Sequence, residues 1–136
     1  MTDSPWNYLI SVERIIDLHK KGIERYGGDF SPPTPDCVEG RLGNAWTAEL
    51  YTEVPGSVTG FNFACFLLYY LTRDHCFTDG NKRVAWLAMV DILLKLGLTI
   101  KVTTNQAEQL CLGILLDQIT TAGVSNWVAE RLEAIS

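Results

Sequence analysis

The stretch FNFACFLLYYLTRDHCFTDGNKRVAWLAMVDILLKLG, residues 61–97, decides the fold of this chain. Two long apolar runs in it flank one short polar segment, HCFTDGNKR, at residues 75–83. The second run is apolar on nearly all of its sides, which is typical of a helix in the centre of a domain. We therefore predict two buried central helices joined by a polar turn, with Gly97 ending the second helix.

The N-terminal part of the chain carries a clear helical pattern. Apolar residues recur at helical spacing through SVERIIDLHKKGIERYGG, residues 11–28, where Ser11 is a candidate N-cap and Gly27 a C-terminal stop. His19 lies on this apolar stripe. We expect it to be a buried, hydrogen-bonded histidine with a structural role, in preference to a catalytic one.

The region between this helix and the central pair is predicted to contain a second helix and a turn. Thr34 and Pro35 follow a loop rich in glycine and proline, and proline is favourable at the first helical position. The helical pattern fails near residues 50–60. The turn signal at residues 54–56 predicts a short hairpin or flap there.

The C-terminal third is predicted to hold one extended segment and two more helices. Residues 98–104 alternate briefly between apolar and polar side chains. A helix follows over residues 105–119, in which Asn105 and Glu108 are spaced as a capping box. Residues 125–135 predict a last short amphipathic helix. The expected class is all-α, a compact helical bundle around the two central helices.

Residues 1–136 have the composition of a single globular domain, with 47% hydrophobic and 20% charged side chains. The net charge of −5 disfavours nucleic acid as a partner, because nucleic-acid-binding proteins normally present a basic face. The first residues lack the basic segment of a signal peptide, and no run reaches the ~18 apolar residues of a membrane span. We expect a cytoplasmic protein that binds neither nucleic acid nor membrane.

The four cysteines, Cys37, Cys65, Cys76 and Cys111, are scattered and form no zinc-binding pattern. We predict free thiols, in keeping with a reducing compartment. Cys65 and Cys111 lie among apolar neighbours and are predicted core residues. Cys76 lies inside the polar segment, but nothing beside it marks an activated nucleophile.

The polar segment has the residue types of a phosphate-binding site. It leads into the first turn of a helix, where unpaired N–H groups and the helix dipole favour an anion. Gly80 allows a ligand to approach the backbone closely, while Lys82 and Arg83 add full positive charge. Asp79 offers an oxygen ligand for Mg²⁺. His75 is the residue type suited to taking a proton from a hydroxyl near neutral pH.

Each of these residues also has a structural alternative. Asp79 is a favoured N-cap type, Asn81 is common in turns, and Lys82 and Arg83 fit a solvated surface pair. Phe77 is predicted to be a hydrophobic anchor that pins the turn to the core. The residue types alone leave the ligand site and these structural roles equally open.

The segment His75-x-Phe77-x-Asp79-Gly80-Asn81-Lys82-Arg83 closely resembles the signature of the Fic/Doc family, H-x-F-x-(D/E)-(G/A)-N-(G/K)-R. Outside it, LHKKGIERYGG at residues 18–28 resembles the end of the first helix of Doc members. Gly40-Arg41 and Thr72-Arg73 fall where Doc members carry similar residues. The resemblance spans about residues 18–132 and implies the all-helical Fic fold.

This resemblance implies an enzyme that transfers a phosphate-containing group from ATP, with Mg²⁺, to a hydroxyl of a target protein. Such transfer depends mainly on positioning and charge neutralisation. The implied roles are general base for His75, Mg²⁺ ligand for Asp79, anion hole for Gly80 and Asn81, and binding of the nucleotide phosphates for Lys82 and Arg83.

Two positions bear on which group is transferred. AMP-transferring Fic members typically have glycine at the position of Lys82 and a second arginine at that of Trp86. In Doc members, a lysine at this position accompanies a nucleotide that is bound in the inverted orientation, and the γ-phosphate is the group transferred. The chain therefore resembles a Doc-type kinase, with a threonine or serine hydroxyl of elongation factor Tu as the implied target and inhibition of translation as the result. AMP transfer, and binding of a nucleotide or partner without catalysis, are the alternatives.

Many Fic members carry an inhibitory helix with the motif (S/T)-x-x-x-E-(G/N). Here Glu39-Gly40 matches its end, but Pro35 stands at its first position, so the chain lacks this motif. The resemblance therefore implies a toxin with a separate antitoxin protein as its partner, docking near the N-terminal helices. The flap predicted around residues 51–54 is suited to pairing with an extended target segment by strand addition.

Overall fold

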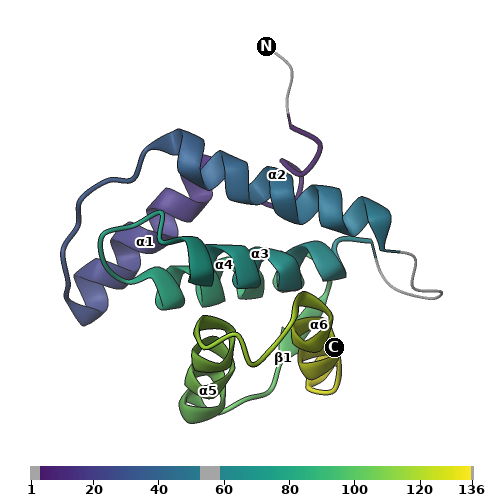
Figure 1. Cartoon of the computed structure of the whole chain (residues 1–136). Helices are drawn as coiled ribbons and strands as arrows, with labels where there is room; N and C mark the ends of the chain where they lie inside the picture. The colour runs from purple at the N-terminus through teal and green to yellow at the C-terminus, as the bar shows by residue number, and fades with distance from the viewer. Residues whose placement is uncertain (1–3, 53–58, 136) are drawn as a thin grey trace.

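The computed structural model of the chain describes residues 4–52 and 59–135. These residues form a helical bundle with one very small sheet (Figure 1). The elements in chain order are α1 (Val12–Tyr26), α2 (Pro35–Tyr51), α3 (Phe61–Asp74), α4 (Asn81–Lys95), β1 (Leu98–Ile100), α5 (Thr104–Leu115), α6 (Thr121–Ala129) and β2 (Leu132–Ala134).

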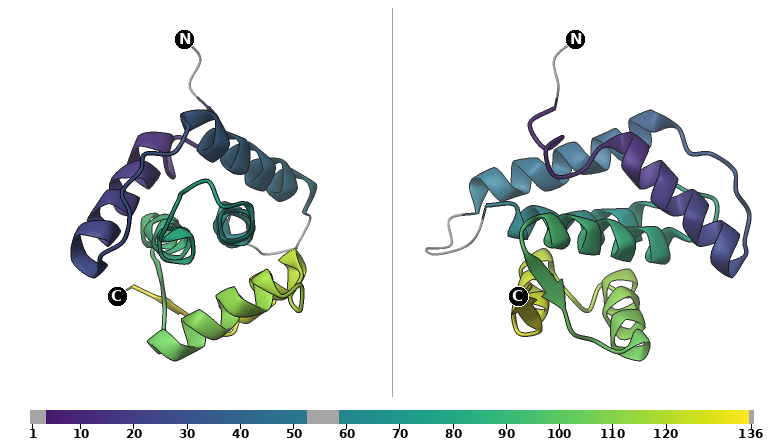
Figure 2. Two further views of the ribbon diagram at one scale, coloured as in Figure 1. Left: turned by 60° about the vertical axis from the view of Figure 1, so that its left-hand side comes forward. Right: turned by 180° about the vertical axis from the view of Figure 1, so that it is seen from behind.

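Helices α3 and α4 lie at the centre of the molecule, as the sequence predicts. The left view of Figure 2 shows them side by side and nearly end-on, with α1 and α2 over one side and α5 and α6 over the other. Most of α3 is buried, and α4 buries one half of its circumference and half-buries apolar residues such as Trp86 and Val90 on the rest. Side chains of Phe63, Leu67, Met89 and Ile92 are among the largest that are fully buried. The all-α class is therefore confirmed.

The predicted ends of the first helix are also confirmed. The Ser11 hydroxyl accepts a hydrogen bond from the Arg14 backbone N–H at 3.1 Å, which satisfies one unpaired donor of the first turn of α1. Gly27 ends the helix with a φ of 84°, and its N–H donates to the carbonyl of Ile23. Pro35 begins α2, as expected from proline at the first helical position.

The C-terminal end of the chain differs from the prediction. The predicted last helix at residues 125–135 is wrong at both ends, because α6 begins at Thr121 and ends at Ala129. The residues that follow form β2, which pairs antiparallel with β1 so that Leu98 faces Ala134 and Ile100 faces Leu132. An extended segment leaves backbone groups unpaired, and pairing with β1 satisfies those of β2.

The capping box of α5 also lies elsewhere. The Thr103 hydroxyl accepts from the Gln106 backbone N–H at 3.1 Å, and the Gln106 side chain accepts from the Thr103 N–H at 2.9 Å. The prediction of Asn105 and Glu108 is therefore wrong by two residues, since both pairs have the same spacing. The prediction that residues 98–104 are extended is confirmed only for β1.

Two further sequence predictions concern membranes and the flap. Within residues 4–52 and 59–135, none of the helices has both the length and the apolar character needed to cross a bilayer. The turn predicted at residues 54–56, on which the hairpin or flap depends, lies outside the described residues.

Candidate active site

The polar segment forms the turn between α3 and α4, at the end of the molecule where α1 also ends (Figure 1). His75 ends α3 in the left-handed conformation, with a φ of 47° and a ψ of 55°, and Gly80 precedes α4 with a φ of 76°. His75 and Asp79 are exposed. The structure therefore places the predicted base and the predicted metal ligand on one solvent-facing turn.

Phe77 and Asn81 hold this turn in shape. Phe77 is 3% exposed, so its predicted role as a hydrophobic anchor is confirmed. The Asn81 side chain accepts a hydrogen bond from the Phe77 N–H at 3.0 Å and donates one to the Phe77 carbonyl at 2.8 Å. This matches the structural alternative for Asn81. The backbone N–H of Asn81 and the second N–H of its side-chain amide are then left for the predicted anion hole.

The first turn of α4 has no side-chain cap. Gly80 is its N-cap residue, and among residues 4–52 and 59–135 no side chain accepts a hydrogen bond from the first-turn N–H groups in the way a capping residue would. The alternative role of Asp79 as N-cap is therefore wrong. An uncapped first turn leaves backbone donors and the positive end of the helix dipole available for an anion.

The main chain around the end of α1 positions Asp79. One carboxylate oxygen, Oδ1, accepts from the Gly80 N–H at 2.8 Å, and Oδ2 accepts from the Asp29 N–H at 3.3 Å. Gly28 lies so close that a Cβ on it would stand 2.7 Å from Oδ2. Gly28 and Asp29 were not predicted to belong to the site, although the pair of glycines after the first helix marks a place where backbone can approach closely.

His19 supports the same residue from the core side. It is 2% exposed, its Nε2 hydrogen-bonds the Asp79 carbonyl oxygen at 2.8 Å, and its ring stacks on Phe77 with 4.1 Å between ring centroids. A second stacking partner is Phe30, at 5.7 Å. The predicted structural role of His19 is confirmed, and the structure adds which residue it supports.

Lys82 and Arg83 are both exposed on the first turn of α4. Arg83 lies over the ring of Tyr26, with 4.3 Å between its guanidinium carbon and the ring centroid. In the part of the chain that the structure describes, neither cation pairs with a carboxylate. Trp86, one turn further along α4, is half-buried and packs against the hydrophobic core.

Two contacts from α2 reach the residues on either side of His75. Arg41 Nη1 pairs with Asp74 Oδ2 at 2.6 Å, and Cys37 forms a disulfide with Cys76. The prediction of free thiols is therefore wrong for this pair. The two cysteines are separated by 39 positions along the chain, so their proximity depends on how α2 packs beside the turn, which spacing alone does not reveal.

The other two cysteines follow the prediction. Cys65 and Cys111 are free and buried. Burial raises the pKa of the Cys65 thiol to about 12. Such a thiol is almost never ionised at neutral pH and is chemically inert.

The donor set around Asp79 fits a magnesium–nucleotide and not a metal cage made by protein alone. No cluster of three or more metal-ligating side chains occurs among residues 4–52 and 59–135. Mg²⁺ commonly binds through one or two carboxylates together with substrate phosphates. The exposed Asp79 carboxylate beside an uncapped helix N-terminus is compatible with that arrangement.

Comparison with known proteins agrees with this geometry. The model of the Fic/DOC family matches residues 9–93, which is more than half of the chain, and the chain belongs to this family. "Protein kinase doc" of Escherichia phage P1 is 28% identical over 117 residues, covering 86% of this chain and 90% of the relative. "Protein adenylyltransferase Fic" of Nematostella vectensis is 29% identical over 102 residues, covering 65% of this chain. The matched part is only 24% of that adenylyltransferase, so this chain corresponds to a small share of its length.

Proposed function

We propose that the chain is a Doc-type kinase that transfers the γ-phosphate of ATP to a threonine or serine hydroxyl of a target protein. One observation carries the proposal: His75, Asp79, Lys82 and Arg83 are all exposed around the uncapped N-terminus of α4. A base, a metal ligand and two cations that no described carboxylate pairs with are the groups that phosphoryl transfer requires at one place.

In the proposed reaction, the target hydroxyl oxygen attacks the γ-phosphorus of ATP. The bond from that phosphorus to the oxygen bridging the β-phosphate breaks, and ADP leaves. His75 takes the proton from the attacking hydroxyl. Gly80 lets the phosphate approach the main chain closely, and the backbone N–H groups at the start of α4, from Asn81 on, hold the phosphate oxygens together with Lys82 and Arg83. Asp79 holds Mg²⁺, which neutralises phosphate charge when bound.

Lys82 and Trp86 support γ-phosphate transfer over AMP transfer. The lysine stands where AMP-transferring members have glycine, and the tryptophan stands where they have a second phosphate-binding arginine. Trp86 packs against the core and has no charge to offer a phosphate. Without that arginine, the site lacks one of the groups that hold ATP with its α-phosphate toward the target.

The family resemblance supports three further parts of the proposal. Elongation factor Tu is the proposed target, with inhibition of translation as the outcome. A separate antitoxin protein is the proposed partner, and the cytoplasm is the proposed location. Strand addition by the target at residues 51–54 stays a prediction, because residues 53–58 lie outside the described part of the chain.

A label-transfer assay tests the proposed reaction. The protein is incubated with Mg²⁺ and elongation factor Tu, in parallel with γ-labelled and α-labelled ATP. His75→Ala removes the proposed base, and Thr78→Ala is the matched control because Thr78 is exposed in the same turn. We expect label from the γ position only, lost in His75→Ala and retained in Thr78→Ala.

AMP transfer is the second candidate, since one relative is named as an adenylyltransferase. Label from the α position would establish it and overturn the kinase proposal. If neither label is transferred but the protein binds ATP, the remaining interpretation is a family member that binds a nucleotide without catalysis. Isothermal titration with ATP and Mg²⁺ separates that case from an assay with the wrong target.

A further inference from the structure

The two α2 contacts described above enclose His75 from both sides. Asp74 pairs with Arg41, and Cys76 is bonded to Cys37, so the residue before and the residue after His75 are both held by α2. The Cα atoms of the two cysteines are 5.6 Å apart, within the usual range for a disulfide. His75 itself is in the left-handed region, which residues other than glycine adopt rarely and only where their surroundings hold them.

The bridge is accessible, whereas the remaining thiols are not. Cys37 and Cys76 are both partly exposed, while Cys65 and Cys111 are 0% and 3% exposed. A dissolved reagent therefore reaches the bridge in the folded protein without reaching the core thiols. Reaction at the bridge is also confined to one place in the fold, the contact between the first turns of α2 and the turn that carries His75.

We propose that Cys37 and Cys76 form a thiol–disulfide exchange site that controls how firmly His75 is held. The co-reactant is a dithiol. One of its thiolates attacks a bridge sulfur, the Cys37–Cys76 bond breaks, and a mixed disulfide forms; the second thiol then displaces the cysteine. Two electrons pass to the bridge, both cysteines end as protonated thiols, and the dithiol becomes a disulfide.

The effect of reduction is local, because other contacts still fix the rest of the turn. Phe77 remains buried and bonded to Asn81, and the carbonyl of Asp79 remains bonded to His19. Reduction releases the backbone at residues 75 and 76 alone. Since this inference rests on the proposed role of His75 as base, we expect kcat to fall about fivefold on reduction while the KM for ATP stays unchanged.

The test compares the wild type with a Cys37→Ser/Cys76→Ser double variant, each equilibrated with oxidised or reduced dithiothreitol. Alkylation followed by mass measurement counts the accessible thiols, and hydrogen exchange followed by mass spectrometry reports the backbone at residues 72–80. Residues 88–95 in α4 are the internal control. In the oxidised wild type we expect no accessible thiol, and after reduction two, with faster exchange at residues 72–80 only.

Two results would overturn the inference. One is Cys37 and Cys76 remaining alkylatable after equilibration with oxidised dithiothreitol. The other is an equal response to reductant in the wild type and the double variant, either in hydrogen exchange at residues 72–80 or in kcat. The hydrogen-exchange measurement needs no catalysis. A protein that transfers no label therefore contradicts the proposed function, while hydrogen exchange still tests the thiol–disulfide site. Conversely, undiminished transfer without a bridge overturns the exchange site alone.

Discussion

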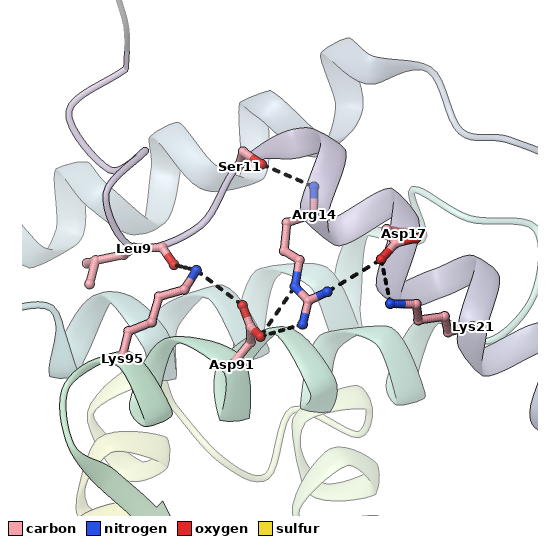
Figure 3. A network of polar contacts seen from close by, with 7 residues as sticks. All are labelled: Leu9, Ser11, Arg14, Asp17, Lys21, Asp91 and Lys95. Carbon is pink, nitrogen blue, oxygen red and sulfur yellow. Dashed lines mark hydrogen bonds and ion pairs between the residues drawn. The ribbon is translucent and has the colours of Figure 1, made fainter.

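Two polar clusters lie at opposite ends of the contact between α1 and α4, one on the two helices and one on the first turn of α4 and the turn before it, and the clusters differ in how their charges are matched. The closed network consists of Arg14, Asp17, Lys21, Asp91 and Lys95, in which every cation meets a carboxylate (Figure 3). The turn cluster consists of His75, Asp79, Lys82 and Arg83, and its two cations meet no carboxylate in the part of the chain that the structure describes.

The comparison separates a structural role from a binding role. Asp91 has a side chain only 14% exposed, and Arg14 reaches it at 2.8 Å, so the two charges satisfy each other. Arg83 instead lies over an aromatic ring, which holds its position without neutralising its charge. A cation held in this way keeps its charge and its donors for an anionic ligand. Four predictions test whether this distinction holds.

The largest expected effect comes from removing an unmatched cation. Arg83→Gln keeps much of the side-chain length and removes the charge, and we expect kcat/KM for γ-phosphate transfer to fall about 100-fold. The melting temperature is expected to change by less than about 2 °C, because the arginine forms no ion pair with a described residue that the change would break. Transfer kinetics and calorimetry measure the two quantities. Activity within twofold of wild type would remove Arg83 from the proposed phosphate site.

The same substitution in the closed network is expected to have the opposite result. Arg14→Gln removes the ion pairs to Asp91 and Asp17, and leaves Asp91 with Lys95 as its charged partner. We expect a loss of about 1.5 kcal/mol in the free energy of unfolding, measured by urea denaturation, since Arg14 is itself partly exposed. Transfer activity should be unchanged. A loss of activity without a loss of stability would contradict the structural role.

Two neighbouring glycines offer a matched test of how Asp79 is held. Both have positive φ, so Gly27→Ala should destabilise the protein by about 1 kcal/mol, and Gly28→Ala by more because its Cβ would also stand 2.9 Å from Ile23 Cδ1. Only a Cβ at Gly28 meets Asp79, because no atom of the described residues outside its immediate neighbours lies within 4 Å of one at Gly27. We expect Gly28→Ala alone to raise the Mg²⁺ concentration for half-maximal transfer about tenfold. An equal Mg²⁺ requirement in both variants would show that this loop does not position the carboxylate.

Much of the fold was predictable because it depends on local pattern. The central pair of helices follows from two apolar runs, and Ser11, Gly27 and Pro35 act on the backbone within a few residues of themselves. The C-terminal strand was not predictable, because β2 is stabilised by pairing with β1, more than 30 residues earlier in the chain. Local sequence propensity does not indicate which distant strand will pair with it.

The candidate site also has a part that was predictable from local sequence and a part that was not. The turn motif at residues 75–83 is contiguous, so sequence alone predicted which side chains lie together. The groups that support it come from elsewhere: Asp29 is 50 positions from Asp79, and Cys37 is 39 positions from Cys76. These contacts exist only once α1 and α2 have packed against the central helices. The same packing explains why one cysteine pair is bridged while the other two thiols are buried singly in the core.

The smallest expected effect concerns acid and the closed network. Burial alone would raise the pKa of Asp91, but the hydrogen bond from Arg14 and the charges of Lys95 and Arg14 outweigh it and lower that pKa. A carboxylate with a lowered pKa stabilises the fold fully above its unfolded value of about 4, and this contribution is lost as the pH falls through the folded pKa. We therefore expect the urea midpoint of the wild type to fall further between pH 6 and pH 3 than that of Asp91→Asn, which has no such group to protonate. Equal falls in the urea midpoint of the two proteins would mean that the partners of Asp91 do not lower its pKa. The closed network would then stabilise the fold no more than the exposed cations of the turn do.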